Sequence, residues 1–172
     1  MAQSQVTVIG HRGASHEAPE NTMAAFTRAL VLGADGIEFD VQLTRDGRAV
    51  VHHDAMLDRT TTGSGPLHAI SSDDIAHLDA GGWFDESFAG EPIPHLGDVL
   101  RLPAEIFELE IKTWGRALLD AVLDEVEGAG VFDRVKFTGW NHSMLSRLKL
   151  ERPDATIGLF SQRPEPWMDD SV

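Results

Sequence analysis

The sequence has 172 residues, of which 42% are hydrophobic, and it contains no cysteine. This length supports one hydrophobic core rather than two full domains, and the lack of cysteine excludes disulfides, thiolate metal sites and a cysteine nucleophile. The formal net charge of −14 argues against nucleic-acid binding, which needs clustered Lys and Arg. An anionic substrate would therefore need a local positive centre, such as a bound cation.

From the sequence we expect neither a signal peptide nor a transmembrane segment. Residues Met1 to Gln5 are polar, and the apolar run that follows is far shorter than the roughly 18–20 residues of a membrane span. We therefore expect a cytoplasmic protein.

The amino-terminal third predicts a strand, a helix and two further strands. Val6–Ile9 is a short apolar run, and Thr22–Leu32 has the apolar spacing of a helix that stops at Gly33. Ile37–Leu43 and Ala49–His53 are again short runs rich in apolar residues, which favours strands. A strand, a helix and a strand in succession favour a parallel sheet with helical crossovers.

The segment 57–102 interrupts this alternation. Glycine and proline recur along it among scattered apolar residues, and connections of this length are usually functional. We interpret residues 57–102 as a subdomain inserted over one end of the fold, with a short helix at Ser72–Leu78.

The alternation of strands and helices resumes after this segment. Strands are predicted at Ile106–Ile111, Val135–Thr138 and Ala155–Phe160, separated by helices over Arg116–Glu127 and Ser143–Leu150. The expected fold is an α/β, TIM-type (β/α) barrel. A complete barrel takes about 250 residues, so we expect it to be truncated after about six strands. Its first and sixth strands would be open edges. We therefore expect either that the chain is part of a longer polypeptide or, if the chain is complete, that another copy covers the edges in a homo-oligomer.

Acidic residues lie within two predicted strands, and the candidates among them are Glu38, Asp40 and Glu110. Glu38 and Asp40 share one strand face, as do Glu108 and Glu110, because side chains alternate along a strand. Carboxylates among apolar neighbours need neutralisation, and an all-oxygen set favours a hard divalent cation, Mg²⁺ or Ca²⁺. The alternative is that Arg or Lys side chains neutralise them.

Two histidines follow predicted strands directly. His11 and His53 would emerge at strand carboxyl ends, where parallel barrels place their chemistry, and two imidazoles can act as general acid and general base near neutral pH. Arg12 offers two parallel donors to phosphate oxygens, and Lys112 a point charge; either could instead balance the acids. His52 alternates to the other face and is expected to be a packing residue.

Eight motifs along the chain carry a resemblance to a known family. They are His-Arg-Gly-Ala-Ser (11–15), Pro-Glu-Asn-Thr (19–22), Gly-Ala-Asp-Gly-Ile-Glu-Phe-Asp-Val (33–41), Thr-Arg-Asp-Gly (44–47), His-Asp (53–54), Asp-Arg-Thr-Thr (58–61), Ile-Pro-His-Leu (93–96) and Glu-Ile-Lys (110–112). In order and spacing this set resembles the glycerophosphodiester phosphodiesterase family.

The resemblance implies a TIM-type barrel that hydrolyses glycerophosphodiesters to glycerol 3-phosphate and an alcohol with a divalent cation. Motif position implies that the metal ligands are Glu38, Asp40 and Glu110. It also implies that the catalytic acid and base are His11 and His53, and that the residues on the substrate phosphate are Arg12 and Lys112.

Two positions depart from the family pattern. Glu108 stands where the family usually has Asn or another neutral residue, and we expect it to sit deeper in the barrel and pair with a base. Gly139-Trp140 replaces the usual Ser-Phe at the end of the fifth strand, which affects the leaving-group pocket. Two alternatives remain: a phospholipase of the sphingomyelinase D type, and an inactive fragment or assembly module.

Overall fold

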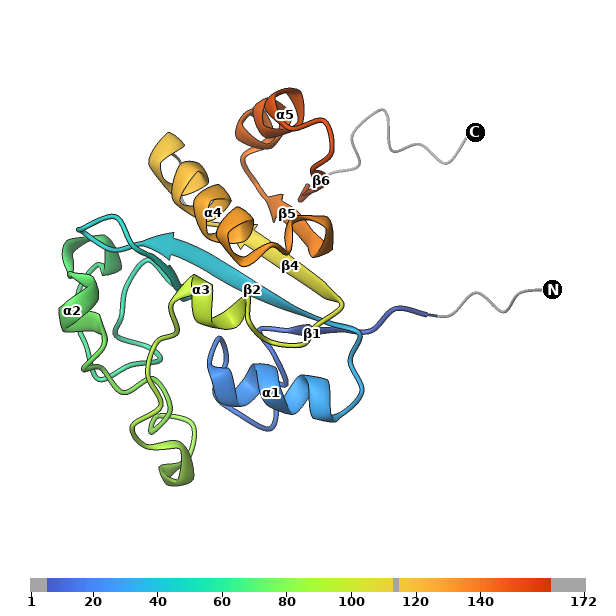
Figure 1. Cartoon of the computed structure of the whole chain (residues 1–172). Coiled ribbons are helices and arrows are strands. Elements are labelled where there is room, and N and C mark those ends of the chain that lie inside the picture. Colours follow the sequence, from blue (N-terminus) through green and yellow to red (C-terminus); the bar gives the residue numbers. More distant parts are fainter. Residues whose placement is uncertain (1–5, 113–114, 162–172) are drawn as a thin grey trace.

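A computed structural model describes residues 6–112 and 115–161, so the polar terminus Met1 to Gln5 lies outside the described residues. Its centre is a sheet in which five parallel strands follow one another in space as β1, β2, β4, β5 and β6 (Figure 1). Their bounds are Ile9–His11, Gly36–Leu43, Ile106–Ile111, Val135–Gly139 and Thr156–Leu159. Parallel strands joined by helical crossovers form part of a TIM-type barrel, as predicted.

Strand β3 (Ala49–Val51) differs in direction from the other strands. It pairs antiparallel with β2, placing Val51 opposite Val41 and Ala49 opposite Leu43. The cause is a tight turn over residues 44–47, in which Gly47 has a φ of +79° and donates its N–H to the Thr44 carbonyl. Strands joined by so short a turn can only be antiparallel. The predicted strand is therefore present, but it is a hairpin partner of β2 and not a further parallel strand.

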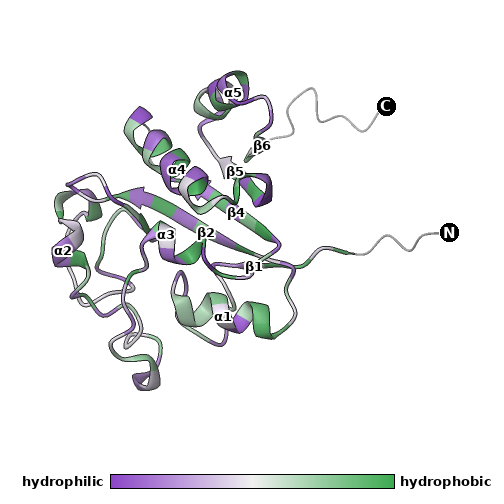
Figure 2. Cartoon of the chain, in the orientation of Figure 1, coloured by the Kyte–Doolittle hydropathy of each residue, from purple (hydrophilic) through white to green (hydrophobic). Residues whose placement is uncertain are grey.

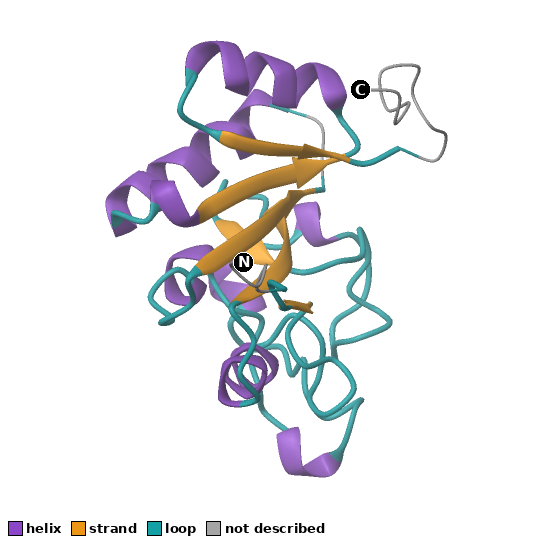
Figure 3. Cartoon of the chain, turned by 90° about the vertical axis from the view of Figure 1, so that its right-hand side faces the viewer, coloured by secondary structure: helices purple, strands orange, loops and turns teal. Residues whose placement is uncertain are grey.

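Three long helices cover the sheet, and two single-turn helices lie in the connection between β3 and β4. Helix α1 begins after Thr22, whose side chain caps the Ala25 N–H, and ends before Gly33, whose φ is +90°. Helices α4 and α5 lie beside each other over the β4–β6 end of the sheet (Figures 1 and 3). The helices are α1 (Met23–Val31), α2 (Ser72–Ile75), α3 (Leu96–Val99), α4 (Arg116–Ala129) and α5 (His142–Glu151), with 3₁₀ turns at Leu67–Ala69, Glu86–Phe88 and Phe132–Arg134.

The two faces of the central strands have opposite character. On β2 and β4, hydrophobic residues alternate with hydrophilic ones (Figure 2). Phe26 of α1 meets Phe39 of β2 edge to face at 5.8 Å between ring centroids, and Phe39 meets Phe107 of β4 at 6.3 Å. This apolar face packs against the helices, so the carboxylates of the same strands project to the other, inner face.

The segment 57–102 has a small apolar cluster of its own. Leu57, Leu67, Ile75 and Ile93 are buried together with Val50 of β3. Leu96 and Val99 of α3, by contrast, belong to the main core. The segment therefore contributes residues both to this small cluster and to the main core. No helix in the described part of the chain is both long and apolar enough to cross a membrane.

Candidate active site

The candidate residues of β1, β2 and β4 converge because the three strands are in parallel register. His11, the last residue of β1, lies opposite Glu38 on β2. Asp40, two residues further along β2, lies opposite Glu110 of β4. The inner face of β2 therefore presents two carboxylates to the third across one strand spacing.

The three carboxylates form a compact, buried acidic cluster. Glu38, Asp40 and Glu110 each offer an oxygen that lies within 4.8 Å of the others, and their relative exposures are 7%, 1% and 6%. Glu38 accepts a hydrogen bond of 2.9 Å from the Arg12 backbone N–H, and Asp40 accepts one of 2.7 Å from the Asn21 amide. These bonds fix the orientation of two of the three acids.

Basic side chains neutralise the cluster only in part. Lys112 Nζ lies 2.9 Å from Glu110 Oε2 and 3.1 Å from Asp40 Oδ1, and Arg12 Nε lies 3.6 Å from Asp40 Oδ2. Within residues 6–112 and 115–161, no hydrogen bond reaches the buried Oε1 of Glu110. A buried carboxylate oxygen without a donor is costly, and a hard divalent cation such as Mg²⁺ or Ca²⁺ suits an all-oxygen donor set. The acidic cluster therefore fits such a cation.

Two carboxyl groups of the acidic cluster have raised pKa values. Burial, followed by the neighbouring charge of Asp40, raises the pKa of Glu38 to about 8. Burial raises the pKa of Glu110 as well, although Lys112 opposes this effect. Carboxyl groups with raised pKa values in a pocket mark a candidate functional site.

The β2–β3 hairpin brings His53 to the same site. The chain turns back after β2, and the His52 backbone N–H donates to the Asp40 carbonyl at 2.9 Å, so His53 follows directly beside the acidic cluster. His53 Nδ1 lies 2.6 Å from Asp54 Oδ1. His53 therefore reaches the site through an antiparallel strand, and not from the carboxyl end of a parallel strand as expected.

His11 and His52 differ sharply in their surroundings. The side chain of His11 is 70% exposed, with Nε2 3.9 Å from Glu38 Oε2, and partial burial together with the charge of Arg12 lowers its pKa. His52 is buried, and its Nε2 lies 3.2 Å from the Met56 carbonyl. His52 therefore packs in the interior, in agreement with the sequence-based expectation.

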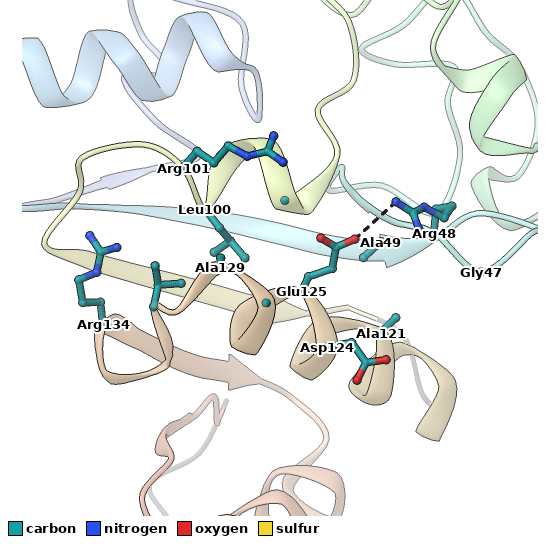
Figure 4. Close-up of a pocket in the computed structure, with 13 residues that line it drawn as sticks. Gly47, Arg48, Ala49, Leu100, Arg101, Ala121, Asp124, Glu125, Ala129 and Arg134 are labelled. Carbon is teal, nitrogen blue, oxygen red and sulfur yellow. Dashed lines mark ion pairs between the residues drawn. The ribbon is translucent and has the colours of Figure 1, made fainter.

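Six of the seven candidate residues line one pocket of about 430 Å³. The seventh, Asp40, is 1% exposed and pairs with Lys112 of this lining. Trp140 and Phe160, whose rings are 5.5 Å apart, form an aromatic side of this pocket. A larger cavity of about 760 Å³ lies between the β2–β3 turn, α3 and α4 (Figure 4). None of the candidate residues lines the larger cavity, so the candidate site lies at the smaller pocket. The six lining residues are His11, Arg12, Glu38, His53, Glu110 and Lys112.

Glu108 also lines the pocket and pairs with a base, as predicted. Its Oε2 accepts a hydrogen bond of 3.0 Å from Lys136 Nζ on the neighbouring strand β5. Glu108 lies opposite Glu38, two residues before the Asp40–Glu110 pair along the strands. Lys136 is therefore the partner that this additional acid requires.

Four polar residues around the site were not assigned a role from the sequence. Asn21 holds Asp40, while Glu20, Asp54 and Arg59 form ion pairs around Arg12 and His53. Asn21 and Glu20 lie in the Pro-Glu-Asn-Thr motif, Asp54 in His-Asp, and Arg59 in Asp-Arg-Thr-Thr. The motifs could have marked these residues, but their partners are visible only in the folded chain.

Known sequences that are similar to this chain point to the same family as its motifs. The sequence profile of the Glycerophosphoryl diester phosphodiesterase family matches residues 11–172. The chain is 44% identical over 169 residues to a glycerophosphodiester phosphodiesterase of Caldanaerobacter subterraneus, an alignment that covers 93% of this chain and 69% of that protein. It is 52% identical over 94 residues to the putative glycerophosphodiester phosphodiesterase YhdW of Bacillus subtilis, covering 55% of this chain and 39% of the relative.

Solved structures of similar proteins share the fold. A glycerophosphodiester phosphodiesterase from Agrobacterium tumefaciens superposes with a TM-score of 0.80 at 38% identity, covering 89% of this chain and 66% of the other. A phosphodiesterase from Oleispira antarctica, solved with the product sn-glycerol-3-phosphate, has a TM-score of 0.87 at 30% identity, covering 94% and 69%. The chain thus spans 69% or less of the length of each of these four proteins.

Proposed function

Because this chain belongs to the glycerophosphoryl diester phosphodiesterase family, we propose that its pocket hydrolyses glycerophosphodiesters to glycerol 3-phosphate and an alcohol. The observation that carries the proposal is the convergence of three buried carboxylates and two histidines on one pocket. Water supplies the hydroxyl group that the phosphorus gains and the proton that the released alcohol gains, so the reaction needs no redox partner.

In this proposal the two histidines move the protons. Asp54, when ionised, can only accept a hydrogen bond, so His53 carries its proton on Nδ1 and leaves Nε2 to accept a proton from the attacking water molecule. His11 lines the same pocket and, when protonated, can donate to the departing alkoxide. No side chain needs to form a covalent bond to phosphorus.

The charged residues around the histidines bind and orient the phosphate. Glu38, Asp40 and Glu110 would hold the Mg²⁺ or Ca²⁺ ion, which when bound offsets negative charge on the phosphoryl oxygens. Arg12 lines the pocket and can donate to the same phosphate, while Lys112 stays beside Asp40 and Glu110. In this proposal, the substrate phosphate contacts both Arg12 and the cation, and the two histidines act on it from the same pocket.

Release of glycerol 3-phosphate tests the proposal. The purified chain is incubated with glycerophosphocholine and either Mg²⁺ or Ca²⁺, and the product is measured with a coupled glycerol-3-phosphate dehydrogenase assay. We expect release that EDTA abolishes and that Glu110→Gln lowers strongly. Activity on sphingomyelin alone would favour the phospholipase alternative, and inactivity on both substrates with each cation would favour the assembly module.

A further inference from the structure

Five charged or titratable side chains form a continuous ion-pair chain along one side of the pocket. In spatial order they are Arg12, Glu20, Arg59, Asp54 and His53, and they come from the loop after β1, the segment after β3 and the end of the β2–β3 hairpin. Arg59 occupies the middle of this chain. Among the described residues it pairs with Glu20 and Asp54, and it does not line the pocket, so its role is not part of the reaction proposed above.

The guanidinium group of Arg59 donates two hydrogen bonds to each of two neighbouring carboxylates, those of Glu20 and Asp54. Nη1 and Nη2 donate to the two oxygens of Glu20 at 2.9 and 2.8 Å. Nε and Nη2 donate to the two oxygens of Asp54 at 2.6 and 3.2 Å. Such bidentate pairs fix geometry as well as charge, and a lysine cannot reproduce them.

On one side of Arg59, this geometry determines how His53 is held. Hydrogen bonds from Arg59 lower the pKa of Asp54 against the opposing effect of burial, so the Asp54 carboxylate remains an acceptor. Its Oδ1 then receives the Nδ1 proton of His53 at 2.6 Å. The imidazole is thereby fixed in one tautomer, with Nε2 free to act on a substrate.

On the other side, Arg59 fixes Glu20, which in turn holds Arg12. Burial alone would raise the pKa of Glu20, but hydrogen bonds from Arg59 and Arg12 lower it. Arg12 Nη1 donates to Glu20 Oε1 at 2.9 Å, and the Arg12 side chain is only 20% exposed. Isolated surface ion pairs contribute little to stability, but a bidentate network around a half-exposed arginine can restrict several side chains together.

We propose that Arg59 is a positioning residue, which through Asp54 orients the proton-accepting histidine and through Glu20 orients the phosphate-binding arginine. One guanidinium group thus sets the distance between the two functional groups. The effect on turnover rests on the proposed phosphodiesterase function, whereas the effect on the His53 tautomer does not. A displacement of about 1 Å in such a group can cost about 100-fold in rate.

The test compares three variants of the full chain. Arg59→Gln removes the charge, Arg59→Lys keeps the charge but loses the double contact, and Arg101→Gln is the matched control. Arg101 lies in the same segment, is 76% exposed and, among the described residues, pairs with Asp98. Thermal unfolding followed by circular dichroism verifies that each variant is folded.

The first readout is independent of catalysis. Long-range ¹H–¹⁵N correlation spectra of the metal-free protein, with His53 assigned through His53→Gln, report which imidazole nitrogen carries the proton. We expect protonated Nδ1 in the unaltered chain and in Arg101→Gln, and a tautomer mixture in both Arg59 variants. Unchanged His53 nitrogens in Arg59→Gln and Arg59→Lys would overturn the proposal, and so would full rescue by Arg59→Lys.

The second readout is the steady-state rate on glycerophosphocholine. Both Arg59 variants should lose about 10- to 100-fold in kcat with a smaller change in KM. Their affinity for Mg²⁺ should be unchanged, because the ion-pair partners of Arg59 are Glu20 and Asp54 and not the carboxylates of the acidic cluster. If Arg59→Gln fails to fold, two other variants test the two ends of the ion-pair chain one at a time. Asp54→Asn should change the His53 tautomer, and Glu20→Gln should mainly raise KM. A tautomer change in a chain that never turns over would contradict the proposed function and leave the positioning role intact; equal tautomers in Asp54→Asn and the unaltered chain would contradict that role.

Discussion

Glu38 holds a proton at neutral pH when no cation is bound, because burial and then the charge of Asp40 raise its pKa to about 8. A divalent cation needs the carboxylate, so binding must displace this proton below that pH. Cation affinity should therefore rise with pH up to about 8 and level off above it. Isothermal titration calorimetry of Mg²⁺ or Ca²⁺ binding in buffers of different ionisation enthalpy measures the proton release.

We expect release of about one proton per cation near pH 6.5, falling toward zero near pH 9. The matched variant Glu38→Gln should bind the cation more weakly and release less. A heat of binding that is the same in all buffers near pH 6.5 would contradict the assignment of Glu38 as a ligand.

The three histidines near the site should respond differently to substitution by glutamine. His11→Gln and His53→Gln should each lower turnover by about 10²–10⁴-fold, as expected for groups that transfer protons. Neither should abolish cation binding, because the predicted ligands are carboxylates. The measurement is kcat on glycerophosphocholine together with the cation affinity of each variant.

His52→Gln is the control in this series. Because His52 is buried and bonded to the Met56 carbonyl, its loss should lower the free energy of unfolding by about 1–3 kcal/mol while the turnover of the folded fraction is kept. Equal losses of turnover at all three positions would mean that the catalytic and structural histidines have been confused.

At the scale of elements, the contact between the β1–α1 loop and helix α1 depends on Gly13. Its φ is +81°, and a β-carbon there would lie 2.5 Å from the Ala25 backbone carbon. Gly47, in the β2–β3 turn, has a similar φ of +79° but nothing within 4 Å. Both alanine variants carry the cost of a left-handed backbone, about 1–2 kcal/mol, but only Gly13→Ala adds a clash with a helix backbone.

Gly13→Ala should therefore lower the free energy of unfolding by at least about 1 kcal/mol more than Gly47→Ala. Urea denaturation of the two variants measures this difference directly. If both variants lose the same stability, the loop after β1 must be able to move away from α1, and the placement of His11 and Arg12 beside it would be less fixed than the structure indicates.

Local patterns were sufficient to predict most elements. Strand β4 has the predicted bounds, Ile106–Ile111, and α1 begins and ends at its expected signals, because burial and capping act over a few residues. Strand parity alone predicted that Glu38 and Asp40 share a face, which is now seen in the acidic cluster. The direction of β3 was not predicted, although Asp46-Gly47 is a turn signal.

Contacts between distant segments were beyond the reach of these patterns. Glu20 and Arg59 are 39 residues apart, and nothing in their local sequences indicates that they pair. The same holds for Glu108 and Lys136, which meet only because β4 and β5 are neighbours in parallel register. The roles assigned to the seven site residues remain predictions, because their convergence alone does not establish what each one does.

At the scale of the whole molecule, the sheet has two open edges. Within the described residues, β1 pairs only with β2, and β6 pairs only with β5. Unpaired backbone donors and acceptors on such edges favour pairing with further strands. We therefore predict that this 172-residue chain associates in solution, with an interface near β1 and β6 of more than about 1,000 Å².

Sedimentation velocity at low micromolar concentration measures this association. The expected species is heavier than the 18.8 kDa of a single chain. A cooperative, active monomer under these conditions would show that the two edges are stable without a partner and would contradict the prediction.

Because the acidic cluster takes its oxygens from two strands, it also affects the order in which the chain folds. Glu38 and Asp40 belong to β2, whereas Glu110 belongs to β4, and the whole segment 57–102 lies between them. During synthesis on the ribosome, the ligand set is incomplete until β4 has emerged and docked. A cation bound to this complete set would link β2 to β4 and so close the loop formed by the chain between them, which reduces the entropy cost of keeping the two strands together. The cation concentration would then affect when the nascent chain becomes resistant to proteolysis.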